Sequence, residues 1–205
     1  MQASEHWDKV YLNKPFDAVS WYAEHLAESL RLIEQLCPDR TAAIVDIGGG
    51  ESTLVDDLLA RGYQDLSVLD ISAAALDFTR QRLGAQAQRV GWHVGDITRY
   101  DFGDKRFDLW HDRAVFHFLT DEAARRAYVD LVRRSVKPGG HVLMATFGPH
   151  GPLKCSGLEV VRYDDQGLHG EFGEGFRLLG SVLEEHHTPM GTNQEFLYCW
   201  CRVSH

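Results

Sequence analysis

The chain alternates between two patterns of apolar and polar residues. Short stretches such as TAAIVDI (41–47) and LSVLD (66–70) are mostly apolar and rich in Ile, Val and Leu. Longer stretches such as SWYAEHLAESLRLIEQL (20–36) repeat apolar residues with the spacing of helical turns. The first pattern is typical of strands buried on both faces, and the second is typical of helices with one buried face. The sequence therefore predicts strand and helix units in turn.

Capping residues and turn residues set the bounds of these elements. Ser72 is expected to cap a helix that Gly84 ends, and Pro138 marks a turn before a strand. Strand and helix units of this length favour a parallel sheet with helices on both faces. The expected strands are 41–47, 66–70, 90–96, 106–112 and 139–147, and the expected helices are 20–36, 51–62, 72–84 and 121–136.

The last part of the chain departs from this alternation. Residues 176–185 and 194–203 have strand patterns, with the turn HTPMGTN between them. A parallel connection needs about a dozen residues or more, so these two strands are expected to be antiparallel. The predicted fold is α/β: a Rossmann-like, doubly wound, seven-stranded sheet that is mostly parallel and ends in a C-terminal antiparallel hairpin.

The composition of the chain mainly excludes classes of protein and partner. A chain of 205 residues with 44% apolar content fits one domain over residues 1–205. It has no signal-peptide core and no long apolar window, so we expect a soluble, cytoplasmic protein that does not bind membranes. The four cysteines form no CxxC pair, which is typical of free thiols, and we expect no metal site. A net charge of −9 makes nucleic acid an unlikely partner.

Three consecutive glycines, Gly48, Gly49 and Gly50, stand where the first expected strand gives way to a helix. In open α/β sheets, ligands bind beyond the carboxyl ends of the strands, and glycines let them approach the backbone. The N-terminus of the following helix favours an anionic group. The dinucleotide pattern G-x-G-x-x-G is incomplete because Thr53 takes the third glycine position, whereas D-x-G-x-G is satisfied from Asp46 onwards.

Further motifs follow in a fixed order along almost the whole chain. They are VDIGGGES, Asp70 in VLDIS, Asp96 in VGDIT, FDLWHDRAVFHFL, and VKPGG before the fifth strand. In this order, and with the antiparallel end of the sheet, they resemble the class I S-adenosylmethionine-dependent methyltransferases. The resemblance implies S-adenosylmethionine as cofactor and S-adenosylhomocysteine as product.

The resemblance also implies roles for the motif residues. The glycine turn would pass beneath the methionine part of the cofactor, whose amino group Asp46 would orient. Asp70 would accept hydrogen bonds from two ribose hydroxyls, a task that suits a carboxylate because it only accepts. Asp96 would accept a hydrogen bond from the adenine amino group.

Four neighbouring side chains complete the implied cofactor site. Ile71 and Ile97 each follow one of the acidic residues, and they would sandwich the adenine ring. His111 and Asp112 end the fourth expected strand, and they would border the sulfonium.

Residues 1–40 precede the first expected strand and carry several aromatic side chains in HWDKVYLNKPFDAVSWY (6–22). In related methyltransferases such a segment often forms a lid over cofactor and substrate. We therefore expect a helical lid that places Trp21 against the cofactor, since aromatic faces suit a sulfonium cation, and Tyr11 near the acceptor. A helix that packs on the sheet through an aromatic stripe is the alternative.

Residues after the fourth and fifth strands are candidates for the acceptor side. His117 lies on the cofactor side of the sheet and is expected to act as a catalytic base, with a core histidine as the alternative. Residues 147–164 exceed a minimal connection, and long loops at a binding edge are commonly functional. Its His150, Arg162 and Tyr163 are therefore expected to bind the acceptor together with Arg113.

The expected function is transfer of a methyl group to a small-molecule acceptor. Such transfer depends mainly on positioning and desolvation, and it needs a base only when the acceptor arrives protonated. The sequence leaves the identity of the acceptor and the oligomeric state open.

Other functions stay as alternatives. HWDKVY (6–11) also loosely resembles the opening of some protein-lysine methyltransferases, although HDRAVF stands where Asn-Pro-Pro-Tyr or a similar motif would be expected. A non-catalytic cofactor-binding module is a further alternative. Thr53 and the hairpin tail disfavour a nicotinamide-dependent oxidoreductase, and Cys155 alone falls short of the several cysteines with which arsenite-methylating relatives bind the metalloid.

Overall fold

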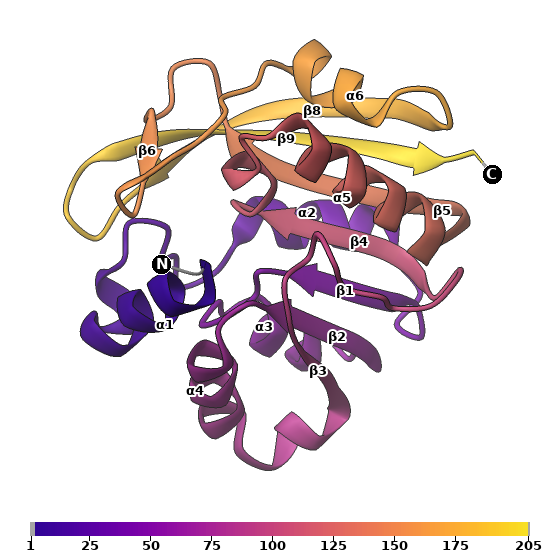
Figure 1. Ribbon diagram of the computed structural model, residues 1–205. Helices are drawn as coiled ribbons and strands as arrows, with labels where there is room; N and C mark the ends of the chain where they lie inside the picture. Colours follow the sequence, from indigo (N-terminus) through magenta and orange to yellow (C-terminus); the bar gives the residue numbers. More distant parts are fainter. Residues whose placement is uncertain (1–2, 205) are drawn as a thin grey trace.

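A central sheet organises the computed structural model, which describes residues 3–204. Within these residues, seven strands lie in the order β3-β2-β1-β4-β5-β9-β8 (Figure 1). β1 to β5 pair in parallel, whereas β9 is antiparallel to both β5 and β8. This order confirms the predicted fold. The strands are β1 (Ala43–Ile47), β2 (Asp65–Asp70), β3 (Val90–Val94), β4 (Phe107–Arg113), β5 (Val136–Phe147), β8 (Phe176–His187) and β9 (Asn193–Val203).

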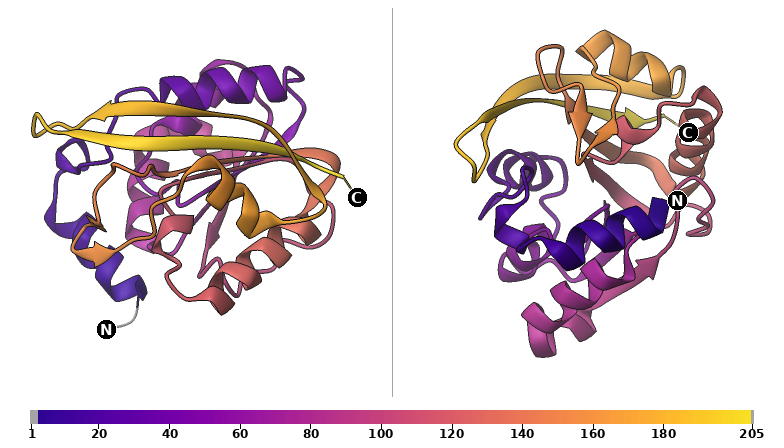
Figure 2. Two further views of the ribbon diagram at one scale, coloured as in Figure 1. Left: turned by 90° about the horizontal axis from the view of Figure 1, so that it is seen from above. Right: turned by 60° about the vertical axis from the view of Figure 1, so that its left-hand side comes forward.

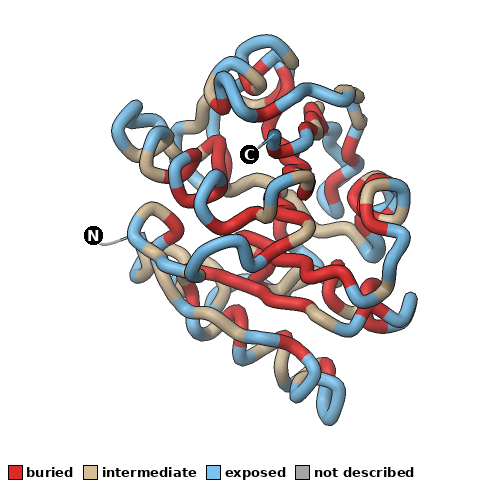
Figure 3. Tube along the Cα trace, turned by 90° about the vertical axis from the view of Figure 1, so that its right-hand side faces the viewer, coloured by how far each residue is buried: buried red, intermediate tan, exposed pale blue. Residues whose placement is uncertain are grey.

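Helices cover both faces of this sheet and bury its apolar side chains. Figure 3 shows the buried residues running along the strands in the centre of the fold. α2, α3 and α4 pack on one face, and α5 and α6 pack on the other. No helix within residues 3–204 has the length and apolar character to cross a membrane. The helices are α1 (Ala3–Asn13), α2 (Ala27–Leu36), α3 (Leu54–Ala60), α4 (Ala73–Leu83), α5 (Glu122–Ser135) and α6 (Asp165–Phe172), with 3₁₀ turns η1 (Phe16–Ala18), η2 (Gly84–Arg89) and η3 (Phe116–Phe118).

The bounds of α4 follow the caps that the sequence indicates. The Ser72 hydroxyl oxygen accepts a hydrogen bond from the Ala75 amide at 3.2 Å and so satisfies a free donor of the first turn. Gly84 follows the last helical residue with φ of 55°, a conformation that residues with a side chain rarely adopt. These two residues therefore place α4 where it was predicted.

The N-terminal segment differs from prediction, because the helix expected over residues 20–36 begins only at Ala27. Upstream, the carbonyl of Ser20 lies 2.9 Å from a ring nitrogen of His186, and that of Trp21 accepts a bond from Arg113 at 3.1 Å. These carbonyls make tertiary contacts in place of intrahelical bonds. Residues 20–26 therefore have an irregular conformation before α2.

The connection after β5 has the expected length but is more structured than expected. It contains a small hairpin of β6 (Lys154–Cys155) and β7 (Leu158–Glu159), and then α6. Asp164 caps α6 by accepting a bond from the Gly167 amide at 2.7 Å. Figures 1 and 2 show that α1 and β6 lie on the side of the molecule to which the parallel strands point.

Candidate active site

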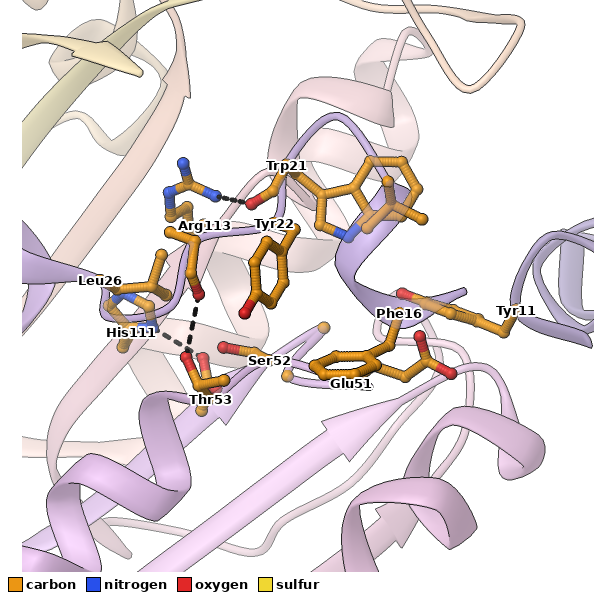
Figure 4. A pocket seen from close by; sticks show the side chains of 15 residues that line it. Tyr11, Phe16, Trp21, Tyr22, Leu26, Glu51, Ser52, Thr53, His111 and Arg113 are labelled. Atoms are coloured by element: carbon orange, nitrogen blue, oxygen red, sulfur yellow. Dashed lines mark hydrogen bonds and ion pairs between the residues drawn. The ribbon is translucent and has the colours of Figure 1, made fainter. Parts of the chain in front are cut away.

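Two adjoining cavities lie at the carboxyl ends of the parallel strands. The larger cavity is about 450 Å³ and lies beside the ends of β2 and β3, and the smaller, of about 50 Å³, lies over the glycine turn (Figure 4). Among the described residues, both cavities share Tyr11, Trp21, Gly48 and Arg113. The predicted cofactor edge and the predicted lid therefore form walls of the same space.

The glycine turn leaves no room for side chains. Gly48 has φ of 69°, and a Cβ there would overlap the Val115 side chain. At Gly49, a Cβ would lie 2.5 Å from Asp46 Oδ2 and 2.6 Å from Val68 Cγ1. Gly50 lines neither cavity, but a Cβ there would lie 2.7 Å from the carboxylate of Asp70. The turn brings bare backbone to the cavity wall.

Asp70 ends β2 at the wall of the larger cavity. It is 4% exposed, and its Oδ1 accepts a hydrogen bond from the Ser72 amide at 2.8 Å. Burial raises the pKa of Asp70 to about 7, because desolvation disfavours the charged form. A buried carboxylate here suits a ligand that brings hydroxyl donors.

Asp96 and its neighbours form another part of the same wall. The Asp96 carboxylate accepts bonds from the Thr98 amide at 2.9 Å and the Thr98 hydroxyl at 2.7 Å, and it lies on an exposed rim. Ile97 is buried, and Ile71 is partly buried. Both isoleucines line the larger cavity together with Asp70 and Asp96, so this part of the space combines two carboxylates with apolar surface.

Asp46 and His111 face the smaller cavity from adjacent strands. They are direct neighbours in the β1–β4 register, and His111 Nδ1 lies 2.7 Å from Asp46 Oδ1. His111 Nε2 lies 3.0 Å from the hydroxyl of Ser29 on α2. Figure 4 shows His111 at the inner wall of this cavity, below Arg113.

Aromatic side chains close the larger cavity on the lid side. Trp7, from α1, lies 6.0 Å from Tyr11, 5.8 Å from Trp21 and 5.1 Å from Phe118, measured between ring centres. Burial and the nearby Asp70 carboxylate raise the pKa of Tyr11, so its hydroxyl stays protonated. The N-terminal segment therefore lines the larger cavity, and its Trp21 and Tyr11 line both cavities.

Asp112 and His117 do not reach either cavity. Asp112 follows His111 in a strand and so points to the opposite face, where it accepts a bond from the Tyr128 hydroxyl at 2.5 Å. His117 is fully buried, and its Nδ1 accepts a bond from the Phe147 amide at 3.3 Å. Burial lowers the pKa of His117 to about 3, so the ring is neutral and packed in the core.

The three predicted acceptor residues in the β5–α6 connection also lie elsewhere. His150 is exposed beside Glu195, and Arg162 donates to the Gly151 carbonyl at 3.2 Å. Tyr163 is buried and bonds to Glu171 at 3.2 Å. Of the expected acceptor set, Arg113 and Tyr11 line the cavities. The Arg113 guanidinium donates to the Trp21 carbonyl and lies 4.1 Å from the Phe196 ring centre.

Other residues that the sequence reasoning did not assign to the site do line the cavities. Glu51, directly after the glycines, faces the smaller cavity, and burial raises its pKa to about 7. Cys155 and Leu158, from the β6–β7 hairpin, line the larger cavity. The adjacency of Glu51 to the glycine turn was a usable signal, whereas no pattern in the loop sequence points to Leu158.

Within residues 3–204, no group of three or more His, Cys, Asp or Glu side chains is arranged to hold a metal ion. Burial raises the pKa of the Cys155 thiol to about 12, so it stays neutral.

Comparison with known proteins adds independent information. Residues 44–140, from β1 to the start of β5, match the family of methyltransferase domains. The eEF1A lysine and N-terminal methyltransferase of Mus musculus is 27% identical over 121 residues, which is 58% of this chain and 17% of that protein. This chain spans at most 20% of the length of the mammalian relatives it matches.

Solved structures share the fold over nearly the whole chain. One, from work on the conversion of a disulfide bond into a thioacetal group during echinomycin biosynthesis, has a TM-score of 0.79 at 19% identity and covers 98% of this chain and 93% of the other. A Burkholderia thailandensis 1,6-didemethyltoxoflavin-N1-methyltransferase with bound S-adenosylhomocysteine has a TM-score of 0.71 at 18% identity and covers 99% and 84%. With the domain match and the strand order, these findings support a class I S-adenosylmethionine-dependent methyltransferase.

Proposed function

We propose that this protein transfers the methyl group of S-adenosylmethionine to a small-molecule acceptor and releases S-adenosylhomocysteine. The observation that carries the proposal is the composition of the larger cavity. Asp70 and Asp96 at the strand ends share it with Cys155 and Leu158 of the β6–β7 hairpin. One space therefore joins carboxylates suited to the cofactor with an apolar region suited to a second molecule.

The chain's residues fit the cofactor. A Cβ at Gly48 or Gly49 would meet neighbouring side chains, so the turn offers backbone where the methionine part would pass. The Asp70 carboxylate is buried at the larger cavity and can accept bonds from ribose hydroxyls. Ile71 and Ile97 offer apolar surface to the adenine ring beside Asp96.

When bound, S-adenosylmethionine supplies an electrophilic methyl group on a sulfonium. The protein's own contribution is to hold the reactants in line and to exclude water. Trp7 and Trp21 of the lid, with Phe118 of η3, close the larger cavity with aromatic surface. Their faces also suit a cation, which favours a charged sulfonium over a neutral thioether.

The acceptor region favours a nucleophile that does not need a general base to remove a proton. Among the described residues that line the larger cavity there is no histidine, and the Cys155 thiol and Tyr11 hydroxyl stay protonated. The lining there is largely apolar, with Phe118, Leu119 and Leu158. We therefore favour a small acceptor with an apolar or aromatic body and a nucleophilic atom that is unprotonated near neutral pH.

Protein-lysine methylation is the second candidate. It is supported by the sequence similarity to the eEF1A lysine and N-terminal methyltransferase. A lysine substrate would enter as a single extended side chain, which demands an open surface around the entrance. The lid and the β6–β7 hairpin, which both reach the larger cavity, favour the small molecule.

Calorimetric titration with S-adenosylhomocysteine tests the cofactor, with a nicotinamide dinucleotide as the comparison ligand. We expect binding of the former alone. A methyl-transfer assay then screens thiols, aromatic amines, small acids and lysine-bearing proteins. Transfer to a small molecule supports the proposal, and transfer to proteins alone replaces it with the second candidate. Cofactor binding without any transfer favours the non-catalytic binding module.

A further inference from the structure

A chain of buried hydrogen bonds leads from the smaller cavity across the sheet. Asp46 Oδ1 lies 2.7 Å from His111 Nδ1, and His111 Nε2 lies 3.0 Å from Ser29 Oγ. Ser29 Oγ in turn lies 3.2 Å from the hydroxyl of Tyr198. The participants come from β1, β4, α2 and β9, so residues far apart in the sequence form one continuous chain.

Every member of this chain is shielded from water. Ser29 and Tyr198 are fully buried, His111 is 1% exposed, and Asp46 is 5% exposed. Polar groups in such a place need partners, because each unmet donor or acceptor carries a desolvation cost. Each of these side chains would leave its neighbour unpaired if it were removed.

The chemistry of the groups fixes the direction of the bonds for a neutral imidazole. The Asp46 carboxylate can only accept, so the proton of His111 must be on Nδ1. His111 Nε2 then accepts from the Ser29 hydroxyl, whose oxygen lies within hydrogen-bond distance of the Tyr198 hydroxyl. The donors of His111 and Ser29 therefore both point toward Asp46, an arrangement in which one bond polarises the next.

The far end of the chain meets a cation. Burial raises the pKa of Tyr198, and the neighbouring Arg113 guanidinium opposes this rise. The same guanidinium donates to the carbonyl of Trp21 in the lid segment. The chain thus runs from the lid contact of Arg113 to the carboxylate beneath the glycine turn.

We propose that Ser29 and Tyr198, acting through His111, are positioning residues that aim the Asp46 carboxylate at the amino group of the cofactor's methionine part. The bond between His111 Nδ1 and Asp46 Oδ1 sets the plane of the carboxylate, and Ser29 contacts the other ring nitrogen of His111 and so orients the ring. The proposal rests on the proposed function, since it assigns Asp46 to that cofactor. None of the three residues transfers a proton to the substrate in this scheme.

A pair of ligands separates positioning from general stability. S-adenosylhomocysteine carries the amino group, whereas 5′-methylthioadenosine has the same nucleoside without it. We expect Ser29→Ala and Tyr198→Phe to weaken binding of S-adenosylhomocysteine about five- to tenfold, the scale of one buried hydrogen bond. The affinity of both variants for 5′-methylthioadenosine should stay within about twofold of that of the native protein. This ligand has no amino group for Asp46 to contact, so the substitutions remove none of its contacts.

Two control variants remove a serine hydroxyl and a tyrosine hydroxyl from other places in the core. Ser135→Ala and Tyr163→Phe each delete a buried hydroxyl from residues that line neither cavity. They should change the affinity for neither ligand. Equal weakening of both ligands by Ser29→Ala and Tyr198→Phe, or no weakening of either, would overturn the proposal. A native protein that binds no S-adenosylhomocysteine would instead overturn the proposed function itself.

A spectroscopic readout tests the bonding of His111 in the native protein. Nitrogen-15 NMR of the histidine rings in the native protein distinguishes the two neutral tautomers of His111. We expect the Nδ1–H form, assigned by comparison with a His111→Gln sample. The Nε2–H form would reverse the donor order and overturn the proposal.

Discussion

The Ser72 hydroxyl donates a hydrogen bond of 2.6 Å to the carboxylate of Asp8, and so ties α1 of the lid to the start of α4. The Ser72 amide also donates to Asp70 Oδ1. One residue therefore connects the lid, the helix cap and a carboxylate of the larger cavity. The N-terminal segment is therefore attached next to a carboxylate that lines the larger cavity.

We expect Asp8→Ala to loosen the lid without weakening the sheet core. Loss of one charge-assisted hydrogen bond should speed dissociation of S-adenosylhomocysteine about threefold to tenfold. Stopped-flow displacement measures this rate. Asp17→Ala is the matched control, since Asp17 is an exposed carboxylate of the same segment. Equal rates in the two variants would show that the Asp8 bond does not hold the lid.

Asp70 predicts a pH dependence of cofactor binding. Its pKa in the folded protein is about 7, well above the ordinary 3.8, because of burial. Ribose hydroxyls prefer the charged acceptor, so affinity for S-adenosylhomocysteine should rise with pH toward and just beyond 7, by at most about tenfold per pH unit. Calorimetry from pH 6 to 8 tests this, and Asp70→Asn should bind weakly with a flatter profile. If the affinity of Asp70→Asn depends on pH as that of the native protein does, the titrating group is Glu51 and not Asp70.

The same pKa shift also affects the stability of the fold, which should fall with rising pH, whereas cofactor affinity should rise. Because the folded pKa is raised, Asp70 stabilises the fold relative to the unfolded chain below its ordinary pKa, and this contribution is lost as pH rises through about 7. Asp70→Asn removes the burial cost of the charge. Free protein carrying this change should therefore gain stability over the native chain most clearly at pH 8, as urea denaturation would measure.

Gly48→Ala should damage both the fold and ligand binding. The residue has φ of 69°, and its Cβ would overlap Val115, so we expect a loss of about 2–4 kcal/mol in the free energy of unfolding. Gly62 offers a matched control, because it also has positive φ, 86°, but its Cβ would meet nothing within 4 Å. Gly62→Ala should cost only the backbone strain, about 1–2 kcal/mol, and keep affinity for S-adenosylhomocysteine. Comparable binding by both variants would contradict a close approach of ligand at Gly48.

Most of the fold was predictable because its signals are local. The buried strands alternate with capped helices, and Ser72 and Gly84 mark the ends of α4 within the sequence itself. The helix expected over 20–36 begins only at Ala27. His186 and Arg113, more than 90 positions away in the sequence, bond to the backbone carbonyls of Ser20 and Trp21. α6 was missed because glycines interrupt its pattern, although Asp164 caps it.

The candidate site was predictable where a side chain's direction follows from the strand that carries it. Asp46, Asp70 and Asp96 end or follow parallel strands and reach one edge. His111 and Asp112 were predicted together, but successive residues of a strand point to opposite faces, so only His111 faces a cavity. Loop residues follow no such rule, and Leu158 rather than Arg162 reaches the larger cavity.

We expect His117 to lower the stability of the fold at acidic pH, and not to act as a catalytic base. Its pKa is lowered to about 3 by burial, so the folded protein holds the ring neutral while the unfolded chain takes up a proton below about pH 6.5. Stability should therefore fall as pH decreases from 6.5, by up to about 1.4 kcal/mol per pH unit from this residue. Urea denaturation of the native protein and His117→Gln at pH 7 and pH 5 measures the difference. Lost turnover with intact cofactor affinity in that variant would return His117 to a catalytic role.

Leu158 offers the most direct test of where the acceptor binds. It lines the larger cavity from the β6–β7 hairpin, whereas Leu153, in the same connection, is 66% exposed and lines neither cavity. Leu158→Trp should fill the acceptor region and raise KM for the small acceptor found by screening at least about tenfold, since overpacking displaces the bound molecule. Affinity for S-adenosylhomocysteine should change little, because the proposed cofactor contacts Asp70 and Asp96 lie at or just after the ends of β2 and β3 and not in the hairpin. Leu153→Trp should behave as the native protein in both measurements. If Leu158→Trp weakens S-adenosylhomocysteine and spares the acceptor, the apolar region belongs to the cofactor, and the acceptor must approach through the smaller cavity.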